Sequence, residues 1–242
     1  MNCRILLVDD HEVVRCGLRA LLQTLDNVTI CGESADGLDA IQRAHQLRPH
    51  IIIADPWLPG ANGVILTRRI LERHPEQKIL IFGLFESDST VRNLLRAGVE
   101  GLVLKTDPAA DILAAIEALQ RNRSYFTSSV ESAILGGYLH PAVPSVVPDQ
   151  RSISLTLREQ EVAQLLAEGR VTKEIGTIFG ISFRTAATHR SNLMRKLGVH
   201  NIAEMTLYAI SHHIIDVPTF RVLAEVAEIR GPARESAARA AA

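Results

Sequence analysis

The chain has 242 residues, which is enough for one large domain or two modest ones. Hydrophobic residues make up 47% and charged residues 22%, a globular composition that excludes a wholly disordered or collagen-like chain. The longest apolar runs, such as Ile51 to Ala54, are too short to cross a bilayer. Three widely spaced cysteines, Cys3, Cys16 and Cys31, favour reduced thiols over disulfides. We therefore expect a soluble, cytoplasmic protein without a membrane partner.

The net charge of −1 conceals a difference between the two parts of the chain. Residues 1–125 hold 14 Lys and Arg against 16 Asp and Glu, whereas residues 151–200 hold 8 against 4. Such an asymmetry favours contact of the C-terminal part with a polyanion, although a few surplus cations are also common on a solvated surface.

The first 122 residues alternate short β-rich runs with amphipathic helical patterns. The expected strands are Arg4–Val8, Val28–Gly32, His50–Ala54, Lys78–Phe82 and Gly101–Leu104, with helices near 11–25, 37–47, 63–74, 88–97 and 108–121. Strands that are apolar throughout and alternate with helices predict a parallel sheet covered on both faces. With right-handed crossovers, this pattern predicts a doubly wound, flavodoxin-like α/β domain over residues 3–122 with strand order 2-1-3-4-5.

Residues 123–152 differ in composition from both flanking regions. After a possible short helix (Ser128–Leu135), the prolines Pro141, Pro144 and Pro148 indicate an extended linker. Residues 153–215 are helical in pattern without strand-like alternation, which predicts a second, all-α domain. We expect the tail, 216–242, to hold one more helix (Phe220–Ile229) and then to be disordered.

Acidic residues follow two of the predicted central strands. Asp9 and Asp10 come directly after the first strand and Asp55 after the third, while Lys105 ends the fifth. In the predicted strand order, these positions share the carboxyl edge of the sheet, where open α/β sheets bind ligands. Converging carboxylates need a cation, and an all-oxygen set suits Mg²⁺. Asp10 could instead cap the first helix.

These segments resemble the receiver domain of bacterial response regulators. The resemblance rests on Asp9-Asp10 after an Ile-Leu-Leu-Val strand, on the run Asp55-Pro-Trp-Leu-Pro-Gly-Ala-Asn-Gly63 and on Gly101-Leu-Val-Leu-Lys105. It implies that Asp55 is a phosphoacceptor and that Lys105 contacts the phosphoryl group. It also implies that Asp9, Asp10, Asp55 and the backbone carbonyl of Trp57 hold Mg²⁺. A carboxylate nucleophile, a metal and a lysine suit phosphoryl transfer, in which negative charge develops at the phosphorus oxygens.

Two positions depart from the receiver pattern. Gly83 stands at the end of the fourth strand, where receivers usually have Ser or Thr, and Leu102 stands where they usually have Tyr or Phe. In the family, the hydroxyl bonds the phosphoryl oxygen and the aromatic ring moves in behind it. Pro56, directly after the acceptor, is also less usual. The phosphorylation site is therefore expected to be complete, while its usual switch is missing.

The second domain begins with a capping box, Thr156 to Glu159, and its first helix continues to Gly169. Thr172 is expected to cap a short helix (Lys173–Phe179), and a tight turn at Gly180 leads into a third helix (Phe183–Leu197). This order is typical of a helix-turn-helix motif, here at about 171–190. On the third helix, Ala186 and Leu193 face inward, whereas small hydroxyls and arginines share the outer stripe, which suits a DNA major groove.

The segment resembles a LuxR-type helix-turn-helix domain, and with the receiver ahead of it the whole chain resembles the NarL/FixJ family. Ala186 stands where Val is usual, and Ala187 stands where a Lys often contacts DNA. The family's dimerisation helix corresponds to Ile202–His213, with Met205, Leu207, Ala209 and Ile210 as candidates for either interface or core. The candidate DNA-binding residues are Lys173, Arg184, Thr185, Ala187, Thr188, Arg190, Ser191, Asn192, Arg195 and Lys196.

The resemblance implies a homodimeric, DNA-binding transcriptional regulator of a two-component system. Its partners would be double-stranded DNA and a sensor histidine kinase or a small phosphodonor, and we do not expect it to be an enzyme. An alternative is a pseudo-receiver transcription factor controlled independently of phosphorylation, which Gly83 and Leu102 favour. A flavodoxin-like enzyme or FMN binder is disfavoured, because Asp9-Asp10-His11 stand where such a protein needs a phosphate-cradling loop.

Overall fold

The computed structural model describes residues 2–84, 88–128, 130 and 155–216. Most of the proline-rich linker, the tail and the helices expected at Ser128–Leu135 and Phe220–Ile229 lie outside these residues. Within them, none of the helices has both the length and the apolar character needed to cross a membrane.

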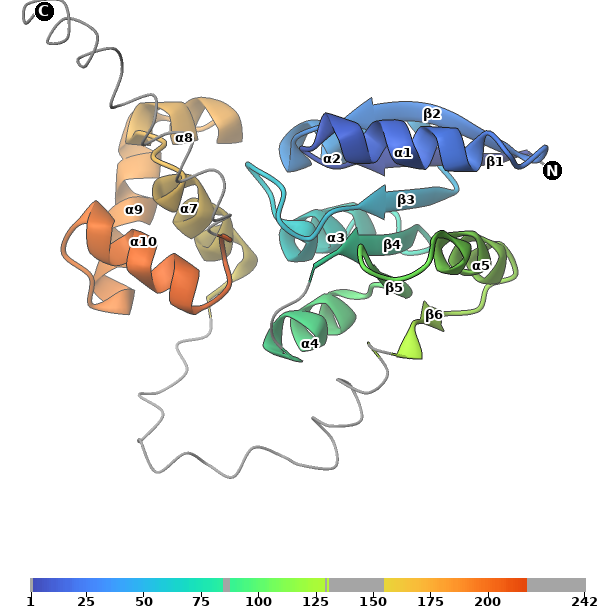
Figure 1. Cartoon of the computed structure of the whole chain (residues 1–242). Coiled ribbons are helices and arrows are strands. Elements are labelled where there is room, and N and C mark those ends of the chain that lie inside the picture. Colours follow the sequence, from blue (N-terminus) through green and yellow to red (C-terminus); the bar gives the residue numbers. More distant parts are fainter. Residues whose placement is uncertain (1, 85–87, 129, 131–154, 217–242) are drawn as a thin grey trace, which may run out of the picture.

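The first domain is a parallel sheet with helices on both faces, as predicted (Figure 1). The strand order is β2-β1-β3-β4-β5-β6. The strands are β1 (Cys3–Val8), β2 (Val28–Ser34), β3 (Ile51–Ala54), β4 (Lys78–Gly83), β5 (Gly101–Leu104) and β6 (Tyr125–Phe126). The helices are α1 (Glu12–Leu22), α2 (Gly37–Leu47), α3 (Gly63–Leu71), α4 (Asp88–Ala97) and α5 (Ala109–Gln120).

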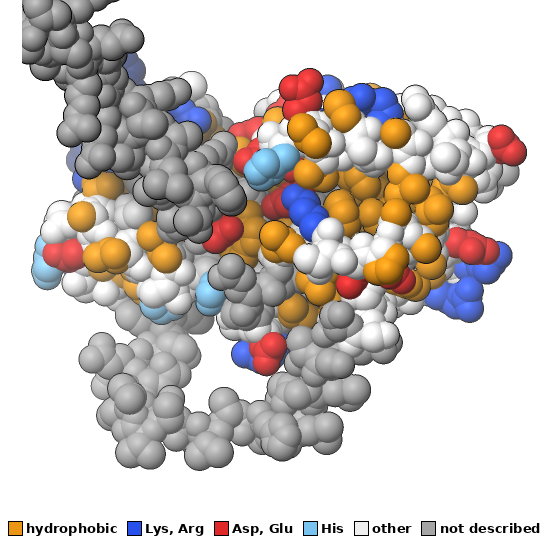
Figure 2. Space-filling model, viewed as in Figure 1, with side chains coloured by type: hydrophobic (Ala, Val, Ile, Leu, Met, Phe, Trp, Pro, Cys, Tyr) orange, Lys and Arg blue, Asp and Glu red, His pale blue; other side chains and the backbone are white. Residues whose placement is uncertain are grey.

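Alternation along each strand divides the core between the two faces of the sheet. Side chains of Leu6, Ile52 and Ile81 pack with α2, α3 and α4, while those of Ile5, Ile53 and Leu80 pack with α1 and α5. Both sets are almost completely buried, which is why β1, β3 and β4 read as continuous apolar runs. Figure 2 shows hydrophobic side chains gathered on the surface of the first domain between α1 and α5 in this view.

The sixth strand corrects the predicted linker boundary. Residue 123 was expected to begin the linker, but Tyr125 and Phe126 pair in parallel with Gly101 and Leu102 of β5. The Tyr125 hydroxyl also donates to Asp111 of α5 at 2.6 Å. A two-residue strand is too short to show alternation, so its sequence carries no strand pattern.

The second domain comprises α7 (Leu157–Ala167), α8 (Thr172–Phe179), α9 (Phe183–Leu197) and α10 (Ile202–Ser211). The capping box at Thr156 and Glu159 is present, as predicted. The cap expected from Thr172 is wrong: Thr172 is the first residue of α8, and Glu174 accepts the N–H of Val171 at 2.9 Å. The side chain of Glu174 thus satisfies the N–H of the N-cap residue Val171, whose own side chain accepts no hydrogen bond.

The two domains meet through α7. In Figure 1, α7 faces the loop between β3 and α3, and the α3–α7 pair is in direct contact. Leu38 of α2 packs against the hydrophobic core of the second domain. The loop itself is held close to α2, because the backbone N–H of Gly37 donates to the Pro59 carbonyl at 2.9 Å. A Cβ at Gly37 would lie 1.9 Å from the Ala61 carbonyl oxygen, so only glycine fits there.

Candidate functional site

The carboxyl edge of the sheet brings together residues that are far apart in sequence. Val8 of β1 lies beside Ala54 of β3, so the next residues, Asp9 and Asp55, leave neighbouring strands side by side. The backbone fixes this arrangement, since the N–H of Asp55 donates to the Val8 carbonyl at 2.8 Å. Lys105 follows β5, and its N–H donates to the Gly83 carbonyl at 3.0 Å.

Lys105 bridges the two buried carboxylates. Its Nζ lies 2.7 Å from Oδ2 of Asp9 and also contacts Oδ2 of Asp55. Burial raises the pKa of Asp55 above its usual value, and the attraction of Lys105 offsets only part of this effect. Burial acts to lower the pKa of Lys105, but the neighbouring carboxylates outweigh it and raise that pKa. The lysine therefore stays charged where two acids need a counter-charge.

Asp10 and His11 form the outer side of this site. His11 Nδ1 lies 2.8 Å from Oδ1 of Asp10 and 3.2 Å from Oδ1 of Asp9. The alternative that Asp10 caps the first helix is wrong, because His11 occupies the N-cap position of α1. Asp9, Asp10 and His11 each offer a possible ligand atom within 4.8 Å of the others. Sequence reasoning did not include His11, although it directly follows the acidic pair.

The donor set fits a hard divalent cation. Asp9 and Asp10 present carboxylate oxygens at the sheet edge, and Asp55 joins them through its shared contact with Lys105. Carboxylate oxygens with neighbouring solvent are the ligands that Mg²⁺ prefers. The Asp9 carboxylate is buried, whereas the side chain of Asp10 is 13% exposed and that of His11 is 64% exposed, so the site meets solvent on the side of Asp10 and His11.

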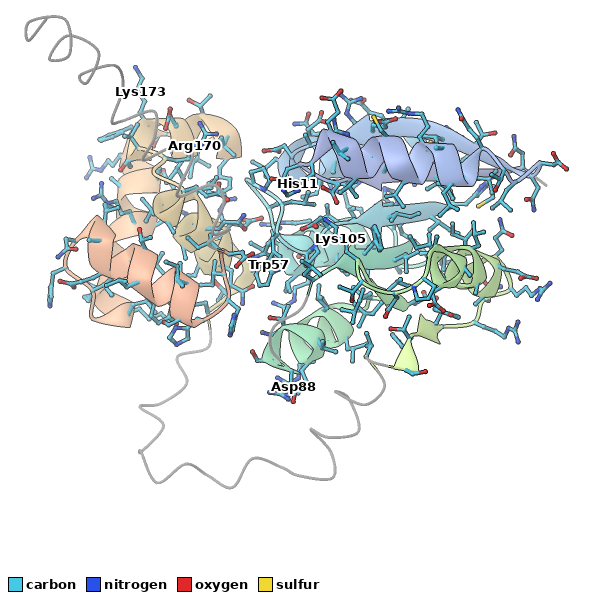
Figure 3. All side chains as sticks on the ribbon, in the orientation of Figure 1. His11, Trp57, Asp88, Lys105, Arg170 and Lys173 are labelled. Atoms are coloured by element: carbon cyan, nitrogen blue, oxygen red, sulfur yellow. The ribbon has the colours of Figure 1, made fainter. Side chains whose placement is uncertain are left out.

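Trp57 fixes the start of the loop that follows Asp55 through two hydrogen bonds. The Trp57 N–H donates to Oδ1 of Asp55 at 2.6 Å, and Nε1 of its ring donates to the Leu84 carbonyl at 3.2 Å. Figure 3 shows Trp57, Lys105 and His11 near one another, on the side of the first domain that faces the second domain. Gly83 ends β4 and Leu102 is fully buried in the core, so the two switch positions hold no hydroxyl and no aromatic ring.

Helix α7 binds the same loop through its polar side chains. Gln164, only 1% exposed, donates to the Leu58 carbonyl and accepts the Asn62 N–H, both at 2.9 Å. Both carboxylate oxygens of Glu168 lie 3.1 Å from the Gly60 nitrogen. Burial raises the pKa of Glu168. The loop that follows Asp55 is therefore hydrogen-bonded to the second domain.

Arg69 of α3 also takes part in this contact. Arg69 makes a bidentate ion pair with Glu161, whose Oε2 lies 2.7 Å from Nη2. Glu161 is 3% exposed, and Arg158 also lies 3.1 Å from its Oε2. The pair raises the pKa of Arg69. Asn62 adds a donated bond from Nδ2 to the Ile214 carbonyl at 2.8 Å. Buried charged bonds of this kind are costly to break singly, because the remaining partner stays desolvated.

Helix α9 presents its polar stripe to solvent. Arg184, Thr188, Ser191 and Arg195 are exposed, whereas Ala186 and Leu193 are buried, so the predicted division of the helix is confirmed. Thr185 and Asn192 are also exposed, and Ala187 is half-buried. The domain contact is made mainly by α7, together with the Ile214 carbonyl, and these residues of the stripe remain exposed.

Three of the candidate DNA-binding cations have partners within the domain. Arg190 donates to the Thr172 hydroxyl at 3.2 Å and so joins α9 to α8. Arg195 donates to Oδ1 of Asn192 at 2.8 Å, and Lys196 pairs with Glu159 at 2.6 Å. Lys173 lies on α8, at the end of the second domain that is remote from the first domain (Figure 3).

The burial of side chains on α10 separates the residues that were candidates for either interface or core. Met205 and Ala209 are fully buried in the core of the second domain. Leu207 is 67% exposed, and Ile210 is half-buried.

Comparison with known proteins agrees with this architecture. Residues 5–117 match the response regulator receiver domain, and residues 153–209 match the bacterial regulatory proteins of the luxR family. The transcriptional regulatory protein LiaR of Bacillus subtilis is 34% identical over 213 residues, which cover 88% of this chain and 99% of that protein. The chain is a response regulator.

Two further proteins are similar to most of the chain. The response regulator protein VraR of Staphylococcus aureus is 34% identical over 215 residues, which cover 89% of this chain and all of VraR. A structure of RcsB from Salmonella enterica serovar Typhimurium, bound to a promoter with the phosphomimetic BeF₃⁻, is 26% identical. It aligns with a TM-score of 0.55 over 86% of this chain and 98% of that one.

The raised pKa of Asp55 generates a prediction about the stability of the response regulator. Because the ionised form is disfavoured in the folded state, its cost is present above the folded pKa and vanishes as the pH falls below the unfolded pKa. Without added Mg²⁺, we expect Asp55→Asn to be more stable than the wild type at pH 7. The advantage should shrink on acidification towards pH 4, as measured by urea unfolding.

Asp26→Asn, at an exposed position between α1 and β2, is the matched control and should change stability little. An Asp55→Asn protein that is less stable than the wild type at pH 7 would contradict the assignment of a strained, buried carboxylate at this site.

Proposed function

We propose that this response regulator binds DNA as a transcriptional regulator of a bacterial two-component system, under the control of phosphorylation at Asp55. The observation that carries the proposal is the Lys105 bridge between Asp9 and Asp55, at the start of a loop bound by the second domain. A positive charge fixed beside a buried carboxylate is what an incoming phosphoryl group requires.

The chemistry follows from the positions of these groups. An Asp55 carboxylate oxygen attacks the phosphorus of a histidine-phosphate or acyl-phosphate donor, the donor bond breaks, and the donor leaves with its electron pair. Mg²⁺, held by Asp9, Asp10, Asp55 and the Trp57 carbonyl, would neutralise charge on the phosphoryl oxygens. Lys105 would then move its contact from Asp55 to the phosphoryl group, since Asp55 carries no charge once it is phosphorylated and the phosphoryl oxygens are anionic.

The contacts of α7 supply a route to the second domain. A phosphoryl group on Asp55 removes the Lys105–Asp55 pair and competes with Asp55 for the Trp57 N–H. Any resulting shift of the loop changes the hydrogen bonds that Gln164 and Glu168 make to Leu58, Asn62 and Gly60. The coupling is bounded by the difference in binding free energy between the two loop states.

The DNA-binding part of the proposal rests on α9. Its exposed arginines and short hydroxyls form a stripe that suits a major groove, with arginines on phosphates and Thr188 or Ser191 near base edges. A homodimer formed through the exposed face of α10 around Leu207 would present two such helices. DNA as the partner would place the protein in the cytoplasm, with a sensor kinase or small phosphodonor acting on the receiver.

A second candidate is a pseudo-receiver, in which partner contacts rather than phosphorylation set the domain arrangement. It is favoured by Gly83 and Leu102, which lack the groups that usually read the phosphoryl state. The two candidates share the DNA-binding surface and differ only in the chemistry of Asp55.

We expect the wild-type chain to gain one phosphoryl group from a small acyl-phosphate donor with Mg²⁺, while Asp55→Asn gains none. Intact-mass measurement is the test, with Asp26→Asn as the control that should behave as the wild type. Equal labelling of wild type and Asp55→Asn would refute the acceptor assignment. No labelling of either would favour the pseudo-receiver.

The DNA interface makes a separate prediction. Each neutralised phosphate contributes a slope of about −0.9 to the dependence of log affinity on log salt. On a non-specific duplex, we expect Arg195→Ala to flatten the slope by about one unit and Thr188→Ala to leave it unchanged. Fluorescence anisotropy across a salt series measures both.

Arg121→Ala at the end of α5 removes the same charge far from α9 and is the matched control. If Arg121→Ala and Arg195→Ala flatten the slope equally, the effect is one of net charge, and α9 is not the docking helix.

A further inference from the structure

The space beside Gly83 is already filled. An ideal Cβ built on Gly83 would lie 2.2 Å from Cδ and 2.5 Å from Cγ of Pro56. Carbon atoms that are not bonded need well over 3 Å, so no side chain fits at residue 83 while the Pro56 ring is in place. Gly83 is not in the left-handed region of φ, and its backbone conformation alone would accept any residue.

The Pro56 ring cannot easily move away from Gly83. Its ring locks the backbone torsion φ, and the Gly63 N–H at the start of α3 donates to the Pro56 carbonyl at 2.9 Å. On its other side, a Cβ at Gly63 would lie only 3.0 Å from Cα of Pro56. Pro56 is buried between these two glycines, one from α3 and one from β4.

Residue 83 is also beside the charged site. Ala54 of β3 lies opposite Ile81 of β4, which brings the continuation of β3 through Asp55 and Pro56 alongside Phe82 and Gly83. The Gly83 carbonyl accepts the N–H of Lys105, the residue whose Nζ bridges Asp9 and Asp55. A side chain at residue 83 would therefore stand at the wall of the phosphoacceptor site.

We propose that Pro56 is a positioning residue of this site, whose ring takes the place of a side chain at residue 83 and makes the β4 wall apolar. The inference rests on the proposed function for Asp55, and it goes further in assigning a cause to the missing hydroxyl. Gly83 is a consequence of Pro56: the pair must change together, and a hydroxyl can be restored only after the ring is removed.

The first test is a double-mutant cycle in the full chain, measured by thermal unfolding. Gly83→Ala should lower the melting temperature clearly in the wild-type background and much less in the Pro56→Ala background. Gly17→Ala is the control, because a Cβ at Gly17 on α1 meets nothing within 4 Å, and it should not lower the melting temperature. Equal losses from Gly83→Ala in both backgrounds, or no loss in either, would overturn the proposed contact.

The second test asks whether the apolar wall matters for an anionic phosphoryl group. Trp57 is the only tryptophan in the sequence, and its backbone N–H donates to the Asp55 carboxylate. Its fluorescence can therefore report binding of beryllofluoride with Mg²⁺. The Pro56→Ala/Gly83→Ser protein should bind beryllofluoride about tenfold more tightly than Pro56→Ala/Gly83→Ala, the factor expected for one charge-assisted hydrogen bond. Gly83→Ser alone should not bind more tightly than the wild type.

Equal affinities of the two double variants would overturn the assignment of residue 83 to the wall of the site. Failure of the wild type and every variant to bind beryllofluoride would contradict the proposed function and this second half of the inference together. The melting temperatures do not depend on phosphoryl chemistry, and they decide the Pro56–Gly83 contact by themselves.

Discussion

The loop from Pro56 to Asn62 is the constraint on which the rest of this molecule depends. It begins at the buried Asp55, where Trp57 N–H binds the carboxylate, and Pro56 is fixed between Gly63 and Gly83. It ends against α7, where Gln164 closes hydrogen bonds to Leu58 and Asn62. Hydrogen bonds and close packing fix the loop at both ends. A displacement of its backbone near Asp55 is therefore expected to move the part that contacts α7.

The charged groups explain why such a site is tolerated in the protein interior. Two buried carboxylates next to each other would repel, and Lys105 between Asp9 and Asp55 offsets that repulsion without removing the cost of burying Asp55. At the domain contact, the same problem is solved by pairing Glu161 with Arg69. The exposed stripe of α9 remains free of this contact, so the proposed control acts on the orientation of the second domain rather than by covering its DNA-binding helix.

Much of the fold could be predicted because periodicity reports burial directly. The runs at Ile5–Val8 and Ile51–Ala54 indicate buried parallel strands, and their strand order brings Asp9, Asp55 and Lys105 to one edge. The two-residue strand β6 was missed because it is too short to have a period. The roles proposed for Asp9, Asp10, Asp55, Trp57 and Lys105 towards a metal and a phosphoryl group remain predictions.

The rest depends on contacts that a single sequence does not display. Gln164 and Glu161 appear on α7 as ordinary polar positions, yet both are buried at the contact with the first domain, where Asn62, Leu58 and Arg69 bind them. The absence of a side chain at Gly83 can be read from the sequence, but its cause, the ring of Pro56 27 positions earlier, requires the register of β3 against β4.

Hydrogen–deuterium exchange of the full chain, with and without beryllofluoride and Mg²⁺, measures whether the loop joins the Asp55 site to the second domain. We expect amide exchange to change in residues 57–63 and in residues 160–168 together, and Gln164→Ala to confine the change to the receiver. A change in residues 57–63 of the wild type with unaltered exchange in residues 160–168 would show that the loop does not join the two sites.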